Sequence, residues 1–251
     1  MKKRLQIGIF TALGLGLACA LTQLWLLGTG YDEAGLLKAA HPAIWLGYVL
    51  AAAGLGLTVF AVLPLNPKPR YHKLFPGSLW AAVGAFAAAL GLIVMGWQQL
   101  AAAVDTLSRV CGIAALIAAA AMGVNGYFRL RGKHPHFAFL AVNCLFFMVA
   151  LYSRYQDWNI ETQNSVFFFP LLALILSMLA CYYRSALDNG SGNVRLWLVF
   201  SLTALFFCCG SLFSRSDPAL MLGFCSYFLG ELTAVRLPKG TKAAPNRERA
   251  P

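Results

Sequence analysis

The feature that most constrains this chain is its series of long, uninterrupted apolar runs. Each run holds about 17 to 24 residues, and a helix of that length, rising about 1.5 Å per residue, crosses the ~30 Å hydrocarbon core of a bilayer. Backbone polar groups must be paired internally in lipid, and the runs lack the alternation of barrel strands, so helices are favoured. Only 12% of the residues are charged, against about 25% in soluble domains. The sequence therefore predicts an all-α integral membrane protein.

The runs predict a polytopic bundle of about eight transmembrane helices, forming a single domain over residues 1–236. The predicted spans are residues 5–28, 43–63, 78–98, 107–128, 137–154, 165–183, 195–214 and 219–236. The first run is longer than the apolar region of a signal peptide, about 7–15 residues, so we expect it to be retained. Residues 237–251 form a short basic tail that we expect to be cytoplasmic and disordered.

The basic residues predict how the chain is threaded. With the N-terminus inside, 16 lysines and arginines fall on one side of the membrane and four on the other, namely Lys38, Arg109, Arg154 and Arg215. The positive-inside rule then makes both termini cytoplasmic, in a plasma or inner membrane. The net charge of +11 is thus a topology signal rather than a sign of nucleic-acid binding, and it also suits anionic inner-leaflet lipids as partners.

Searches for catalytic and cofactor motifs argue against most enzyme classes. The seven cysteines all fall inside predicted spans without a C-x-x-C pair, and the four histidines all fall outside them. We find no H-E-x-x-H, G-x-S-x-G or Walker P-loop sequence. The sequence therefore predicts no cofactor or metal site and favours a protein that is not an enzyme.

Glu231 is the one acidic residue inside a predicted span, about one turn from its inner end. Charge near the bilayer centre costs about 2.5–3.5 kcal/mol on insertion scales, so such a group is a candidate functional residue. Pairing with Arg184, Arg195 or Arg236 would satisfy it structurally, and this is the favoured interpretation. The alternative is a role in ion coupling or gating.

Similar helix ends recur along the chain, in the sequences "GYFRLRG", "CYYRSAL" and "TAVRLPKG". Their arginines, Arg129, Arg184 and Arg236, lie 55 and 52 residues apart. A duplicated helical hairpin would give this spacing. Any series of hairpins that obeys the positive-inside rule would also give it, and we favour that explanation.

A second candidate region joins the fifth predicted span to the outer loop that follows. Asn143 and Arg154 are eleven residues apart, about 20° around a helix, so they share one face. Beyond them, Arg154 is expected to reach Asp157, and Glu161 adds a further polar group. These residues are candidates for ligand binding, although helix packing and a membrane exit with its aromatic belt explain most of the polarity.

The two halves of the chain differ in composition. Only four of the 18 phenylalanines precede residue 125, and the first half is rich in alanine and glycine. Gly8, Ala12, Gly16 and Ala20 form a small-residue stripe suited to close helix packing. We expect tight packing in the first half and bulkier, more lipid-facing packing in the second.

These observations favour a small-solute transport or substrate-capture component of the membrane, because the chain is almost wholly embedded and its longest polar connections face outward. The alternative is a sensory or assembly protein that acts through helix contacts with a membrane-protein partner. An intramembrane enzyme is the third possibility.

Overall fold

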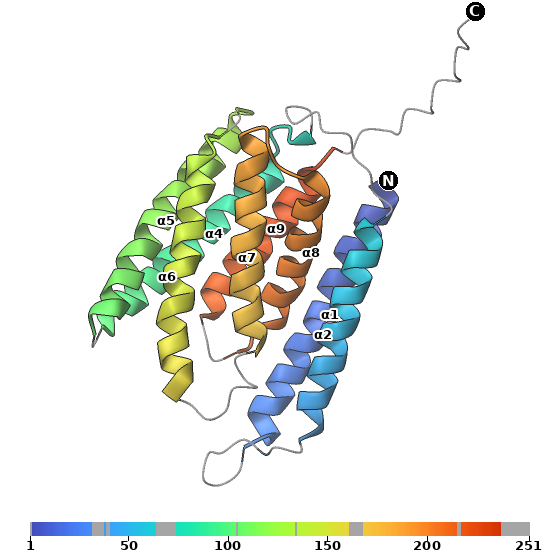
Figure 1. Cartoon of the computed structure of the whole chain (residues 1–251), viewed down its shortest axis with the longest axis vertical. Coiled ribbons are helices and arrows are strands. Elements are labelled where there is room, and N and C mark those ends of the chain that lie inside the picture. The colour runs from blue at the N-terminus through green and yellow to red at the C-terminus, as the bar shows by residue number, and fades with distance from the viewer. Residues whose placement is uncertain are drawn as a thin grey trace, which may run out of the picture.

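A computed structural model describes residues 2–31, 38, 41–63, 74–103, 105–133, 135–160, 168–214 and 217–236. Within these ranges the regular elements are eight α-helices (Figure 1). They are α1 (Lys2–Thr29), α2 (Pro42–Val62), α4 (Leu79–Ala101), α5 (Thr106–Leu130), α6 (Ala138–Ile160), α7 (Phe168–Asp188), α8 (Val194–Gly210) and α9 (Pro218–Ala234). The prediction of an all-helical membrane bundle is confirmed.

The predicted number of spans needs correction. Six helices, α1, α2 and α4 to α7, are long and apolar enough to cross a membrane, and α8 is apolar but has only 17 residues. The last helix, α9, also has 17 residues, which corresponds to about 26 Å of helix and falls short of a ~30 Å core. The count is therefore six clear spans, or seven with α8, rather than eight.

Helices α4 to α9 form a closed ring. Each of them packs against the helix before and after it in the chain, and α9 closes the ring by packing against α4. The α1–α2 hairpin lies outside the ring and packs mainly against α8 (Figure 1). In this ring α6 is opposite α9, while α5 and α7 are each the second neighbour of α9.

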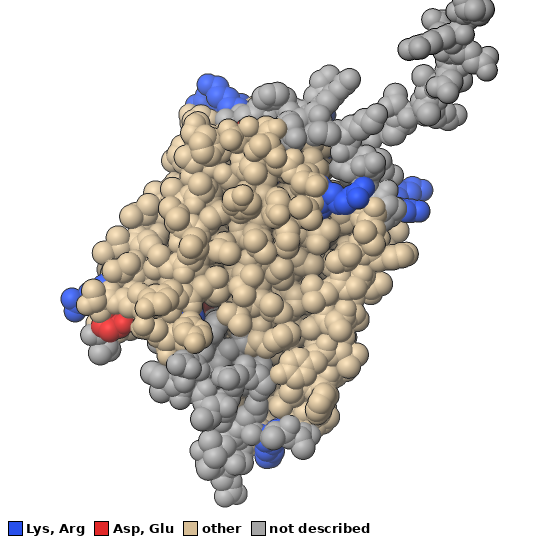
Figure 2. Space-filling model, viewed as in Figure 1, with Lys and Arg blue, Asp and Glu red and all other residues tan. Residues whose placement is uncertain are grey.

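Both ends of the bundle carry the charged side chains, and an uncharged belt separates them on the face seen in Figure 2. We call the end where α1 begins and α9 ends the terminal end, and the other the distal end. Leu5 and Arg236 line one pocket at the terminal end, which brings the two extremities of the bundle together. Each described helix runs in the direction opposite to the one before it (Figure 1).

Glycines allow the close contact that closes the ring between α4 and α9. A Cβ atom added at Gly84 would lie 2.5 Å from the carbonyl oxygen of Ser226, and one at Gly230 would lie 2.5 Å from that of Trp80. Gly91 and Gly223 approach the opposite backbone in the same way. Any side chain at these positions would push the two helices apart, since carbonyl oxygens belong to rigid backbone.

The small-residue stripe of α1 also packs as predicted. A Cβ atom at Gly16 would lie 2.7 Å from Cβ of Cys209 in α8, and one at Gly8 would lie 3.3 Å from Cβ of Ala61 in α2. Ala12 and Ala20 are fully buried. This face therefore fixes the hairpin against the ring.

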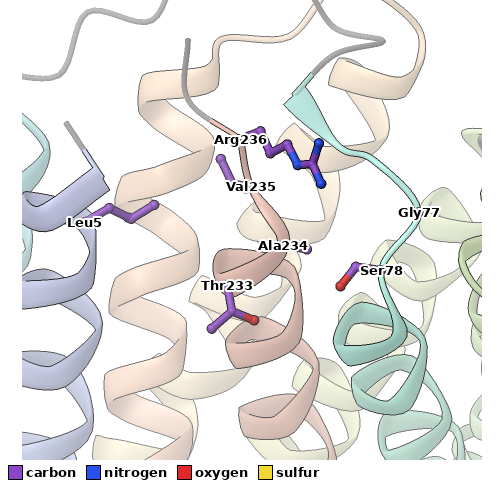
Figure 3. A pocket seen from close by; sticks show the side chains of 7 residues that line it. All are labelled: Leu5, Gly77, Ser78, Thr233, Ala234, Val235 and Arg236. Atoms are coloured by element: carbon purple, nitrogen blue, oxygen red, sulfur yellow. The ribbon is translucent and has the colours of Figure 1, made fainter. Parts of the chain in front are cut away.

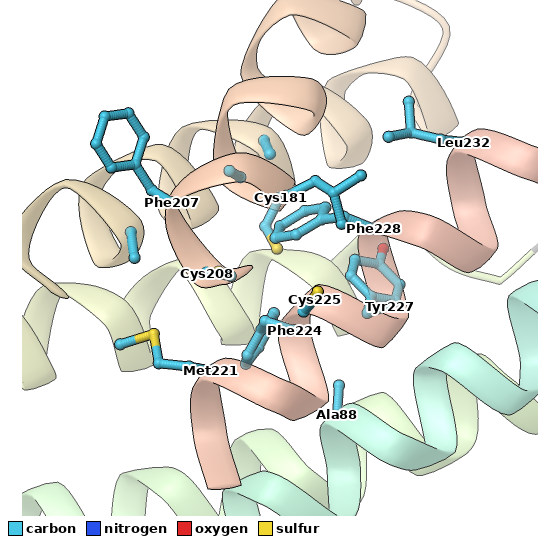
Figure 4. Close-up of a cluster of buried hydrophobic side chains, with 14 of the residues drawn as sticks. Ala88, Cys181, Phe207, Cys208, Met221, Phe224, Cys225, Tyr227, Phe228 and Leu232 are labelled. Carbon is cyan, nitrogen blue, oxygen red and sulfur yellow. The ribbon is translucent and has the colours of Figure 1, made fainter. Parts of the chain in front are cut away.

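Seven phenylalanines of the second half are buried inside the protein rather than facing lipid, contrary to expectation. Phe147 of α6 and Phe224 of α9 meet across the ring with centroids 4.8 Å apart. Figure 4 shows Phe224 and Phe228 packed with the thiols of Cys208 and Cys225. Lipid and protein interior are both apolar, so composition alone does not tell which of them a phenylalanine faces.

Candidate functional site

The candidate site is a group of charged side chains at the terminal end of the ring. Arg129 lies in the last turn of α5, Arg184 in the last turns of α7, and Glu231 one turn before the end of α9. All three helices end at the terminal end. The fold therefore brings these three residues to one level of the bundle from three different helices.

Glu231 joins the two arginines through a single carboxylate oxygen. Arg129 donates from Nη2 to Oε2 over 2.9 Å, and Arg184 donates from Nε to the same oxygen over 3.1 Å. Arg184 also donates from Nη1 to Oδ1 of Asp188 over 2.5 Å. The side chains of Arg129, Arg184 and Glu231 are only 1–2% exposed. We call Arg129, Arg184, Asp188 and Glu231 the ion cluster.

The charges of the ion cluster balance, since two arginines face two carboxylates. Removing charges from water is expensive, and a buried pair is compensated only by good geometry and further hydrogen bonds. Loss of one partner from such a group typically costs about 3–5 kcal/mol. The four residues are therefore expected to behave as one unit rather than as independent pairs.

Phe75 covers the ion cluster. Its ring centroid lies 3.7 Å from Cζ of Arg184 and 5.6 Å from Cζ of Arg129, so it offers both guanidinium groups a cation–π contact. Its carbonyl oxygen accepts a hydrogen bond from Nη1 of Arg129 over 3.4 Å. Trp197 of α8 holds the ring edge-on, with centroids 4.9 Å apart. The segment before α4 thus forms part of the site.

Several buried polar atoms in the cluster and next to it make no hydrogen bond within the described part of the chain. They include Oε1 of Glu231, Nε of Arg129, Nη2 of Arg184, the hydroxyl of Tyr227 and both amide atoms of Asn125. Tyr227 lies four residues before Glu231, and Asn125 lies four residues before Arg129. Both are thus one helical turn deeper in the ring than the ion cluster. These groups provide donors and acceptors that the fold itself does not use.

The distal end has a simpler ion pair between Arg154 of α6 and Asp217, the residue before α9. Their side chains are 18% and 12% exposed. Asp217 adopts a left-handed backbone conformation, with φ of 38°, immediately before Pro218. We call Arg154 and Asp217 the distal pair. It connects opposite sides of the ring, because α6 is opposite α9.

The other predicted residues of this region are placed as follows. Asn143 is fully buried and donates from Nδ2 to the carbonyl oxygen of Phe139 over 2.8 Å, within its own helix. Arg154 contacts Asp217, a partner that the sequence reasoning did not propose. The side chain of Asp157, the expected partner, and the whole of Glu161 lie outside the described residues.

Sequence reasoning found part of the ion cluster. Glu231 was a candidate because it is an acid within an apolar run, and Arg184 was one of its three expected partners. Arg129 and Phe75 were missed. The recurrence of Arg129 and Arg184 at similar helix ends was the available signal, although nothing in it showed that both face the same carboxylate.

Among the described residues, no three or more His, Cys, Asp or Glu side chains are grouped so that they could hold a metal ion. The comparisons with known proteins give no further guidance, because no family model, curated protein or solved structure matches the chain.

Proposed function

We propose that the protein transports a small polar solute across a membrane. In this proposal the ring of α4 to α9 surrounds the path, and the ion cluster is the gate at the terminal end. The observation that carries the proposal is Glu231, which joins α9 to both of its second neighbours through one buried oxygen.

The energetic cost of the ion cluster supports a functional role. Well-packed hydrophobic residues in place of a buried ion group often leave a protein equally or more stable. A helical bundle therefore does not need four buried charges to hold together, and charges within membrane helices usually mark pathways or relays.

The two ends of the ring share one helix, which supports a gating mechanism. The ion cluster joins the end of α9 to α5 and α7, and the distal pair joins its beginning to α6. If the ion cluster or the distal pair breaks, the corresponding end of α9 is released from helices that are not its neighbours in the ring. Gates of this kind open by small rigid-body shifts of packed helices.

The unused polar atoms suggest the class of solute. Oε1 of Glu231 accepts hydrogen bonds, while the Tyr227 hydroxyl and the Asn125 amide both donate and accept. Nε of Arg129 and Nη2 of Arg184 are further unused donors, so a small molecule that carries both hydrogen-bond donors and acceptors fits this set. Phe147 and Phe224 close the ring further in, so the conformation described is a closed one.

Cys181 offers a test that does not require the solute. It is fully buried in α7, three residues before Arg184. A variant that keeps Cys181 and replaces the other six of the seven cysteines by alanine is placed in liposomes and treated with a membrane-impermeant maleimide. We expect Glu231→Gln to raise the labelling rate from the terminal side at least tenfold, an effect of about 1.4 kcal/mol on the opening equilibrium.

Asp217→Asn is the matched control, because it breaks the distal pair and leaves the ion cluster intact. It is expected to leave labelling from the terminal side unchanged. Circular dichroism on each variant establishes that the helices are retained. Unchanged protection of Cys181 in a folded Glu231→Gln protein would show that the ion cluster does not gate the ring.

A further inference from the structure

Two adjoining pockets follow the seam between α4 and α9 at the terminal end. The first, of about 360 Å³, is lined by Leu5, Gly77, Ser78 and residues 233–236 (Figure 3). The second, of about 340 Å³, is lined by Trp80, Val83, Gly84, Ser226, Leu229, Gly230 and Thr233. Thr233 lines both pockets, so the two adjoin at this residue, and we call them together the groove.

The length of this groove matches one leaflet of a bilayer. It follows α9 from Ser226 to Ala234, about 12 Å of helix, and continues over Val235 and Arg236 beyond the end of the helix. Half of a ~30 Å hydrocarbon core is of similar length. Trp80 stands at the groove with 70% of its surface exposed, and tryptophan is typical of the membrane interface.

The first pocket has the chemistry of a phosphate site. Arg236 is exposed, and its side chain makes no hydrogen bond or ion pair with the described residues. Its backbone N–H donates to the carbonyl oxygen of Leu74 over 2.9 Å, which fixes its position beside the pocket. None of the residues that line the pocket is acidic. An anion would therefore meet an available guanidinium group without a competing carboxylate.

The beginning of α4 adds hydrogen-bond donors to this pocket. Ser78 is the N-cap residue, and its side chain makes no capping hydrogen bond. The first backbone N–H groups of a helix have no partner within the helix and carry a partial positive charge. In Figure 3 the Ser78 hydroxyl lies across the pocket from Thr233. These donors and Arg236 come from different segments and converge on one space.

The second pocket is apolar because its hydroxyl groups are already used. Ser226 donates to the carbonyl oxygen of Leu222 over 2.9 Å, and Thr233 donates to that of Gly230 over 3.0 Å. Gly84 and Gly230 bring the backbones of the two helices into contact at the floor of this pocket. Its remaining walls are the side chains of Trp80, Val83 and Leu229. Such a surface suits a hydrocarbon chain.

We propose that this groove binds one anionic glycerophospholipid. Arg236 and the beginning of α4 hold its phosphate, and an acyl chain lies in the second pocket against Trp80, Val83 and Leu229. The site is independent of the proposed transport function. It lies on the same helix as Glu231, however, so an occupied groove would hold α9 against α4 beside the ion cluster.

Fluorescence quenching of Trp80 tests this proposal on the full-length protein. The protein is reconstituted in phosphatidylcholine with a fraction of brominated phosphatidylglycerol, and in phosphatidylglycerol with the same fraction of brominated phosphatidylcholine. A parallel Trp80→Phe protein isolates the signal of Trp80. We expect the association constant of brominated phosphatidylglycerol at Trp80 to be about fivefold higher than that of brominated phosphatidylcholine. One favourable contact between a basic residue and an anionic lipid has an effect of this size.

Arg236→Ala is expected to remove this preference. Arg109→Ala is the matched control, because Arg109 is also exposed but lies in the first turn of α5, at the distal end. It should leave the preference intact. Ser226→Phe, which fills the second pocket, should reduce quenching by both brominated lipids.

Two results would overturn the proposal. Equal quenching by the two lipids in the unmodified protein would mean that the groove does not select an anionic headgroup. Trp80 shielded from both brominated lipids, with the protein migrating as a larger assembly, would mean that a partner helix occupies the groove instead.

Discussion

The two ends of the ring close by related chemistry in different surroundings. At the terminal end four charged groups from three helices are almost completely buried beneath Phe75, whereas at the distal end one arginine and one aspartate remain partly exposed. Exposed pairs contribute about 0–1 kcal/mol, because water screens them. A buried group loses about 3–5 kcal/mol when one partner is removed. Breaking the ion pairs is thus expected to cost several-fold more free energy at the terminal end than at the distal end, although α9 takes part in both.

Removal of the central carboxylate should have the largest effect. Glu231→Gln leaves Arg129 without its only acidic partner in the described structure and weakens the contact to Arg184. We expect a loss of about 3–5 kcal/mol in the free energy of unfolding, because a buried positive charge is left uncompensated. Reversible unfolding by denaturant in detergent micelles measures it.

A quadruple variant sharpens this prediction. Replacing Arg129 and Arg184 by methionine, and Glu231 and Asp188 by leucine, removes all four charges of the ion cluster together. It should recover most of the stability that Glu231→Gln loses. If stability is recovered while Cys181 is still labelled rapidly, the gating role of the cluster is separate from its structural role. A quadruple variant less stable than Glu231→Gln would contradict the view that the ion cluster is energetically dispensable.

Loss of the aromatic cover should have an intermediate effect. Phe75→Leu keeps an apolar side chain over the arginines but removes both cation–π contacts, so we expect a loss of about 1–2 kcal/mol. Phe146→Leu is the matched control, since Phe146 is also buried, at 1% exposed, and has no cation over its ring in the described structure. Thermal unfolding of the two variants compares them, and equal shifts would mean that the ring over Arg184 contributes only apolar area.

The distal pair should show the smallest effect. Asp217→Asn and Arg154→Gln, alone and together, form a double-mutant cycle. We expect a coupling free energy below about 1 kcal/mol that decreases further as the salt concentration rises. A coupling as large as that between Glu231 and Arg184, and insensitive to salt, would remove the contrast between the two ends.

The contrast also indicates what a sequence can predict in a protein of this kind. Apolar runs located the helices, and the single acid within a run identified Glu231, because both signals are local. The partner Arg129 was missed because α5 and α9 face each other only after α9 has packed against α4. That closure depends on glycines spaced by seven residues on each helix, Gly84 with Gly91 and Gly223 with Gly230. Such a spacing does not show which other helix will pack against it.

Other differences have physical causes of the same kind. The length of an apolar run in the sequence did not show that α8 and α9 have only 17 residues each. The sequence does not mark clearly where the helix ends and the residues that flank it begin. The phenylalanines of the second half face one another across the ring, since both lipid and protein accept them. Arg154 reaches Asp217 because helix ends that are distant in sequence meet at the ring's rim.

The closure of the ring by α9 against α4 has a consequence for how the protein is made. Helices leave the ribosome in order, so α4 to α8 are synthesised before the helix that fits between α8 and α4. Until then Arg129 and Arg184 are in the membrane without the carboxylate that joins them. The nascent bundle must shelter two arginines near the lipid surface, and a chain that stops before α9 is expected to be recognised as unfinished and degraded.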